Sequence, residues 1–192
     1  DNTVRDLYVA GNNFALGQTA GEYIKTTTPE AEVVVIRGMP IPIDQERQDG
    51  FDKGVEGSGV KILDRQYGNW NRDDAFKVMQ DYLTRFKQID AVWASDDDMA
   101  IGVLKAIEQA RRSDIKEVFG GAGAKFAVKK VMDGDRLVQA DVSYSPKFIY
   151  DAIKMTANAR LKGQALPPRT IIPSVLITRA NARQFYFPDS PY

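Results

Sequence analysis

Polar and aromatic side chains recur where the apolar segments of this chain end, and their types suit contact with a hydroxyl-rich molecule. Arg and Asp side chains form charge-assisted hydrogen bonds with hydroxyl groups, and an aromatic face covers the C–H face of a sugar ring. Ligand sites collect at such strand ends in open α/β sheets, so the pattern predicts a binding site there. The residues concerned are Asn12 with Asn13, Arg47, Trp70 with Asn69 and Asn71, Asp96 with Asp97, and Tyr144.

Each of these side chains also has a purely structural interpretation. Trp70 could belong to the core, and Arg47 could pair with Asp44 or Asp49 on the surface of one helix. The pair at 12–13 could be no more than a turn, because Asn is a common turn residue. The hypothesis of a binding site therefore depends on several polar groups following successive strands.

Catalysis finds weaker support in the residues. Asp96 and Asp97 could serve as a carboxylate pair for glycoside hydrolysis, but neighbours at a helix start usually point apart, whereas two catalytic carboxyls must flank one bond. Lys125 follows a glycine-rich run at 120–123, which lacks the spacing and the Ser or Thr of a phosphate-binding loop. With neither Cys nor His in the chain, thiol nucleophiles and the usual proton shuttle are excluded, and we expect no cofactor and no metal.

The stretch 91–102 is expected to supply a strand and the start of a helix that position the polar groups of the predicted site. Residues 91–94 are short, apolar and unbroken, which is typical of a parallel strand covered on both faces. Three aspartates at 96–98 follow, where they can cap a helix and interact with the positive end of its dipole. Caps and solvated surface are the alternative to a binding role for these three residues.

Strand and helix patterns alternate along most of the chain. This order predicts an α/β fold: a doubly wound parallel sheet sandwiched by helices, with right-handed crossovers. We expect strands at 7–10, 33–36, 60–63, 91–94, 116–119 and 137–142, and helices between them, including one from about 44 to 55 and one from about 147 to 161.

Composition limits the remaining possibilities. The 192 residues carry 26 basic and 26 acidic side chains, so overall charge indicates neither nucleic acid nor an anionic membrane as a partner. Hydrophobic residues make up 43% of the chain, which suffices for a globular core, and no apolar run is long enough for a membrane span. The first residues do not read as a signal peptide, which a mature chain would have lost.

The order of motifs resembles the periplasmic sugar-binding proteins of ABC importers, of the ribose-binding-like type I fold. The resemblance extends from about residue 7 to residue 177. It rests on four segments: Gly11-Asn12-Asn13 through Ala20-Gly21, Arg47-Gln48-Asp49-Gly50-Phe51, Trp93 through Gly102, and Val118 through Gly123. It implies a Rossmann-like lobe of a non-enzymatic receptor that captures a small sugar or polyol in a hinged cleft, resides in the periplasm and delivers its ligand to an ABC permease.

The resemblance also implies that an amino-terminal lobe is missing from this chain. Residues 1–144 would form the carboxy-terminal ligand-binding lobe. Residues 145–192 would be returning segments, namely a helix of the absent lobe, a final crossover strand and an aromatic tail. The apolar face of that helix would then be exposed or covered by a partner.

The family pattern assigns roles to individual positions. Arg47 matches an arginine that binds sugar hydroxyls, Trp70 an aromatic residue that stacks on the sugar, and Asp96 an Asn or Asp that binds hydroxyls. Met39 falls near a wall of the cleft. Asn12, with Gly11 before it, matches the first hinge crossing.

Three departures from the ribose type indicate a different sugar, a polyol or another small polar ligand. Tyr144, at the second hinge crossing, replaces an amide, and Asp96 replaces an Asn. Gly121-Ala122 stands where ribose-type binders carry an aromatic residue followed by Asp, which removes a carboxylate from the site.

Two other function classes remain open. The first is the effector-binding core of a lactose-repressor-like transcription regulator, which shares the ligand core but would need a helix-turn-helix that this sequence lacks. The second is an enzyme on a doubly wound sheet, disfavoured by the missing Cys, His and phosphate loop.

Overall fold

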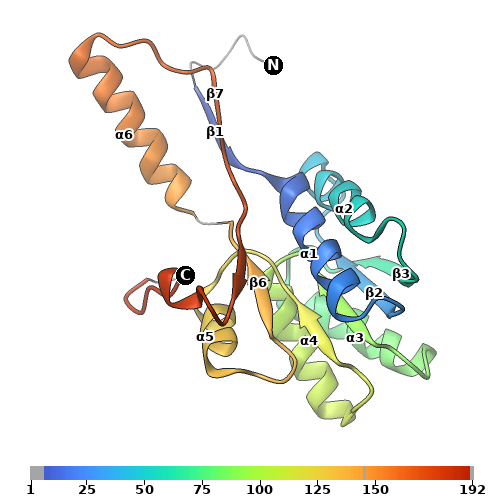
Figure 1. Ribbon diagram of the computed structural model, residues 1–192. Helices are drawn as coiled ribbons and strands as arrows, with labels where there is room; N and C mark the ends of the chain where they lie inside the picture. Colours follow the sequence, from blue (N-terminus) through green and yellow to red (C-terminus); the bar gives the residue numbers. More distant parts are fainter. Residues whose placement is uncertain (1–6, 145, 191–192) are drawn as a thin grey trace.

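A four-stranded parallel sheet forms the centre of the larger part of the molecule (Figure 1), in the computed structural model, which describes residues 7–144 and 146–190. The strand order is β3-β2-β4-β5, and every neighbouring pair runs parallel. This confirms the predicted α/β class. The strands are β2 (Glu32–Arg37), β3 (Lys61–Tyr67), β4 (Ala91–Ala94) and β5 (Glu117–Phe119).

Helices cover both faces of this sheet. Val33, Val35 and Trp93 point to the face under α1 (Asn13–Thr27) and α2 (Pro42–Val55). The alternate residues of the same strands point to α3 (Arg72–Arg85) and α4 (Asp97–Ala110). Since all four residues of β4 are buried, its unbroken apolar sequence is explained by cover on both sides.

Glycines bring α1 and α2 into close contact. A Cβ atom on Gly17 would lie 1.8 Å from the backbone oxygen of Arg47, and one on Gly50 would lie 2.0 Å from that of Phe14. No other residue type permits this approach. The contact fixes the height of α2, and with it Arg47, above the sheet.

A smaller part stands away from this lobe (Figure 1). Strand β1 (Tyr8–Gly11) pairs in parallel with β7 (Arg169–Ile172), outside the four-stranded sheet, and α6 (Lys147–Lys162) lies beside them. Ile149, Ile153 and Leu161 on α6 are 58%, 65% and 84% exposed. The helix thus has an uncovered apolar face in this chain, as expected from the sequence.

Three chain segments connect the two parts, and hydrogen bonds join them side by side. The Asn12 N–H donates to the Ile172 oxygen (3.1 Å), and the Ser174 hydroxyl donates to the Asn12 oxygen (3.1 Å). Ser143 and Val175 exchange two bonds of 2.9 Å each. Strand β6 (Ala140–Val142) then pairs antiparallel with β8 (Leu176–Thr178).

The chain end returns to the larger lobe. Phe185 and Tyr186 follow the short helix η2 (Ala182–Gln184) and pack on a cluster that includes α5 (Lys125–Asp133) and β8. The aromatic tail therefore covers a surface over part of its length; Tyr192 lies outside the described residues. In space, β8 and this tail group with the larger lobe, and β1 groups with β7.

One expected strand is shorter than its sequence pattern. The apolar run from 137 to 142 forms a ladder only at Ala140–Val142. The Asp135 carboxylate accepts hydrogen bonds from the N–H groups of Leu137 and Val138, at 2.9 Å each, and so holds the beginning of the run in a turn.

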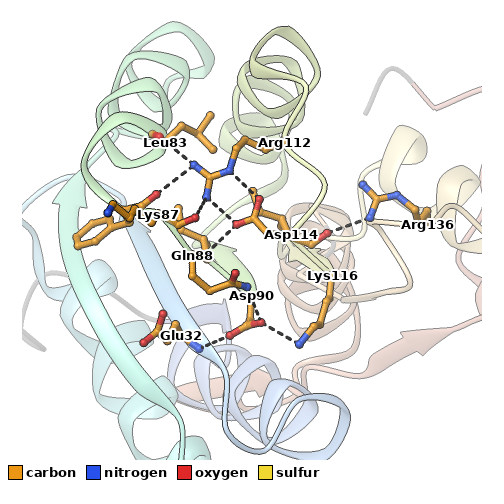
Figure 2. Close-up of polar contacts among 12 residues, drawn as sticks. Glu32, Leu83, Lys87, Gln88, Asp90, Arg112, Asp114, Lys116 and Arg136 are labelled. Atoms are coloured by element: carbon orange, nitrogen blue, oxygen red, sulfur yellow. Dashed lines mark hydrogen bonds and ion pairs between the residues drawn. The ribbon is translucent and has the colours of Figure 1, made fainter.

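A polar cluster ties the ends of several elements together at the amino ends of the sheet strands (Figure 2). The Arg112 guanidinium donates to the backbone oxygens of Leu83, Phe86 and Lys87, just where α3 ends, and pairs with Asp114 at 2.6 Å. This bond is the main reason why the pKa of Asp114 is lowered to about 2.

Among the described residues, no helix is long and apolar enough to cross a membrane.

Candidate functional site

Arg47 lies at the centre of the predicted site, and neighbours from several segments fix its position. Its side chain is on α2 and only 6% exposed. The Nε group donates to Asn13 Oδ1 at 3.1 Å, and Nη1 donates to the backbone oxygen of Ser95. Asp44, considered as a surface partner, instead forms a 2.6 Å ion pair with Arg37. Arg47 is thus held in place by groups at the carboxyl end of β4 and at the start of α1.

Two aromatic rings flank this guanidinium. The Arg47 Cζ atom lies 4.9 Å from the centre of the Tyr144 ring and 6.0 Å from that of Trp70. Both distances are within the range of cation–π attraction. These three residues were predicted to share one site, and the structure brings them together.

Glycines, which have no side chain, make room for both rings. A Cβ on Gly38 would lie 2.1 Å from the Trp70 indole, and one on Gly11 would lie 2.3 Å from the Tyr144 ring. Trp70 itself adopts a left-handed backbone (φ +51°), an uncommon conformation for a bulky residue. Its buried indole N–H has no hydrogen-bond partner within the described residues. Trp70 is therefore held in a strained turn at the margin of a core cluster, against which it packs, and it carries an unused donor.

Asp96 closes the site at the start of α4. Its Oδ1 accepts a 2.8 Å hydrogen bond from the Met99 N–H, so it caps the helix as expected. Burial raises the pKa of this half-buried carboxyl, and the charge of Arg47 partly opposes that shift. Asp96 thus caps α4 and lies close enough to Arg47 to interact with its charge, and its role in ligand binding stays a prediction.

Asp97, next to it, is fully buried. Its two carboxylate oxygens accept hydrogen bonds from the N–H groups of Gly121 (2.9 Å) and Ala124 (2.7 Å). The two neighbouring aspartates therefore face different surroundings, which does not suit a carboxylate pair flanking one bond. Lys125 donates to the backbone oxygens of Pro188 and Ser190, in the tail.

The segment Gly121-Ala122 follows β5 and lies beside Tyr144. The Tyr144 N–H donates to the Ala122 oxygen at 2.9 Å. Ala122 is 7% exposed and adds neither charge nor hydrogen-bonding side-chain atoms. This edge of the site is thus formed by backbone and a methyl group.

Met39 and Asn12 are two further residues predicted for the site. Met39 is 41% exposed, in the loop between β2 and α2. Asn12 Oδ1 accepts from the Ala15 N–H at 2.9 Å and so caps α1. The residue that reaches Arg47 is Asn13, 4% exposed. Its signal in the sequence was only its place in the Asn-Asn turn, which does not tell one side chain from the other.

The arrangement offers fixed hydrogen-bonding groups and aromatic faces for binding a small polar molecule. Arg47 and Asp96 carry opposite charges at adjacent strand ends, and Trp70 and Tyr144 supply aromatic surface. Such a constellation orients hydroxyl groups. Within the described residues, no cluster of three or more acidic side chains could hold a metal ion.

Comparison with known proteins finds relatives among the periplasmic binding proteins. A model of the periplasmic binding protein domain matches residues 1–165. The ribose import binding protein of Escherichia coli (strain K12) is 30% identical over 174 residues, which are 90% of this chain and 58% of that protein. The chain thus spans a little over half the length of this relative.

Two solved structures have similar folds. The Caulobacter myo-inositol binding protein, bound to myo-inositol, gives a TM-score of 0.80 at 30% identity, covering 91% of this chain and 60% of that one. An ABC transporter solute binding protein from Mycobacterium smegmatis, with bound glycerol, gives 0.82 at 29% identity, covering 93% and 63%.

Proposed function

This chain belongs to the periplasmic binding protein domain family, and from this premise we propose that it binds a small sugar or polyol for import. The ligand lies against the Arg47 site in a hinged cleft, and the closed form delivers it to an ABC transporter permease in the membrane. The protein works in the periplasm and without catalysis. The names of its relatives support this proposal, because they are import binding proteins or hold sugars and polyols.

The observation that carries the proposal is the setting of Arg47. Asn13, Ser95, Trp70 and Tyr144 come from four separate segments and all contact this one side chain. A buried arginine fixed in this way supports recognition of hydroxyl groups better than it supports a role in stability, because burying a charge is costly. The regulator hypothesis has no comparable observation in its favour.

We further propose that a second lobe of the full-length protein completes the cleft. The uncovered apolar residues of α6 support this, and so does the chain's coverage of 58% of the ribose import binding protein. This lobe would pack on α6 and on the β1–β7 pair. Hinge closure of two such parts around a ligand is a common switching mode.

Tryptophan fluorescence of the full-length protein tests the proposed function directly. In this chain there are only two tryptophans, and Trp93 is fully buried against Phe51 with ring centres 4.3 Å apart. A ligand at the Arg47 site should therefore change the emission of Trp70. The titration uses a panel of pentoses, hexoses and polyols that includes D-ribose and myo-inositol.

We expect a saturable change with one compound of the panel. Trp70→Ala should abolish this signal and weaken binding, measured by calorimetry, by about 1 to 3 kcal/mol, the scale of one buried aromatic contact. Trp93→Phe is the matched control and should keep the signal. Absence of binding heat with every sugar and polyol would overturn the proposal, and unchanged affinity in Trp70→Ala would remove Trp70 from the site.

A further inference from the structure

Asp97 and Asp141 form a buried acidic pair that the binding site described above does not use. Asp97 is 1% exposed, in the first turn of α4, and Asp141 is 0% exposed, in the middle of β6. Both carboxyl groups accept hydrogen bonds from the same short segment of backbone, 121–124, so they lie close together. Two ionised carboxylates buried this close repel each other, which favours a proton on one of them.

The pair holds the backbone of the segment Gly120–Ala124. Asp97 accepts from the N–H groups of Gly121 and Ala124, and Asp141 Oδ2 accepts from that of Gly123 at 3.1 Å. The chain wraps so closely around Asp97 that a Cβ on Gly120 would lie 2.2 Å from its Oδ1 atom. Three backbone N–H groups of this segment are thus bound by two side chains.

The same segment is joined to the hinge. Ala122 forms a parallel bridge with Ser143, and its backbone oxygen accepts the Tyr144 N–H. Asp141 precedes these residues by two and three positions on the same strand and accepts from the Val142 N–H at 2.7 Å. The acidic pair therefore lies under the place where the loop after β5 meets the Arg47 site and the crossing to α6.

Charges around the pair favour retention of its proton. Burial raises the pKa of Asp97 to about 6, and burial together with the charge of Asp97 raises the pKa of Asp141 well above its usual range. Asp96 faces the pair from its own turn with a further negative charge. From the elements packed on it, α5 contributes the Ala124 N–H, while the Lys125 ammonium is bound to the tail.

We propose that Asp97 and Asp141 share one proton at neutral pH and act as positioning residues, which together hold Gly121-Ala122 and the Tyr144 backbone in place for ligand binding. The effect on ligand binding rests on the proposed function, whereas the acidic pair and its shared proton do not depend on that function. When the proton is lost, two adjacent carboxylates repel each other and the segment loosens.

Amide hydrogen exchange of the ligand-free full-length protein tests the proposal. We expect the protection factors of Gly121, Gly123 and Ala124 to fall by about tenfold or more as the pH is raised from neutral into the alkaline range, the scale of losing a buried hydrogen bond. The variant Asp141→Asn keeps a donor toward Asp97 and cannot ionise, so its protection factors should stay constant over this range. Asp133→Asn, an exposed change on α5, should behave like the unmodified protein.

Identical pH profiles of the unmodified protein and Asp141→Asn would overturn the proposal. A second measurement needs no variant: a ¹³C NMR titration of the aspartate carboxyl carbons should show one carboxyl still protonated at neutral pH. Ionised signals for every aspartate at that pH would equally overturn it. Neither readout involves a ligand, so failure of the sugar-binding proposal would leave both results interpretable.

Discussion

Arg47 differs from a surface arginine in how little freedom its side chain retains. The Asn13 amide fixes one edge of the guanidinium, and the Tyr144 ring lies 4.9 Å from its centre. The guanidinium is planar and presents several donors in a rigid fork, which matches these surroundings. An ammonium group cannot present donors in this arrangement. The geometry of the guanidinium, in addition to its charge, is therefore what the site preserves.

The substitution Arg47→Lys tests this distinction. We expect at least about tenfold weaker binding of the compound identified by the fluorescence titration, because the charge remains but the fork is lost. Calorimetry measures the change. Arg65→Lys is the control, because Arg65 pairs with Asp52 on the exposed surface and should leave the affinity unchanged. Equal affinities of both variants and the unmodified protein would show that Arg47 contributes only charge.

The position of a residue after a strand predicted which residues surround it. It predicted less well in which direction the side chain points. Arg47, Trp70 and Tyr144 were expected in one site and lie together, since carboxyl ends of parallel strands meet at one edge. A turn motif could not show which of Asn12 and Asn13 contacts Arg47, because one residue caps the helix and the other begins it. Their roles as ligand contacts remain predictions.

At the scale of elements, Asp114 links α3, β4 and β5 through one carboxylate. It accepts from the Ile89 N–H at 2.9 Å and pairs with Arg112, which holds the carboxyl end of α3 (Figure 2). Arg112 is the main cause of the low pKa of Asp114, about 2 in the folded protein against an ordinary value of 3.8. A carboxyl whose pKa is lowered by folding stabilises the fold above its ordinary pKa, and this contribution disappears as the pH falls through the lower value.

The substitution Asp114→Asn should therefore lower the free energy of unfolding at neutral pH by about 1 to 2 kcal/mol, the scale of a charge-assisted hydrogen bond. The difference from the unmodified protein should shrink between about pH 4 and pH 2. Urea unfolding at a series of pH values measures it. Asp52→Asn, at a half-exposed position, should show a smaller effect; a difference for Asp114→Asn that did not depend on pH would contradict the assigned ion pair.

Elements with strong local patterns were predictable, and those defined by distant partners were not. The helix expected between the strands at 60–63 and 91–94, which is α3, and the apolar strand at 91–94 formed as expected, because each buries its own apolar residues. The membership of β1 in a separate two-stranded sheet depends on β7, which lies far along the chain. The shortened β6 depends on side-chain bonds from Asp135 that hydrophobicity does not encode.

At the scale of the whole molecule, the two parts differ in how completely they are covered. The larger lobe has a core of fully buried residues on both faces of its sheet, whereas Ala159 is the one buried residue among those described in α6. Exposed apolar surface of this kind marks an interaction site. The uncovered face of α6 agrees with the proposed second lobe. Without that lobe, this chain must be stable with the apolar face of α6 exposed to water.

The substitution Ile153→Lys tests this uncovered face. In the isolated chain we expect a change in the free energy of unfolding within about 0.5 kcal/mol, because the side chain is 65% exposed. Binding of a hydrophobic dye should fall. Thr156→Lys, also exposed on α6, should leave dye binding unchanged. A clear loss of stability in Ile153→Lys would show that this face is covered in the isolated chain.

The pairing of β1 with β7 also determines the order in which the chain can fold during synthesis. Tyr8 lies opposite Arg169 in the ladder, so the first strand leaves the ribosome long before its partner exists. The sheet β3-β2-β4-β5 joins strands that are much nearer in sequence and can close earlier, because shorter loops lose less entropy on closure. We therefore expect β1 to remain without its partner β7 while the larger lobe forms. That interval is when the nascent protein most needs protection from mispairing with other strands.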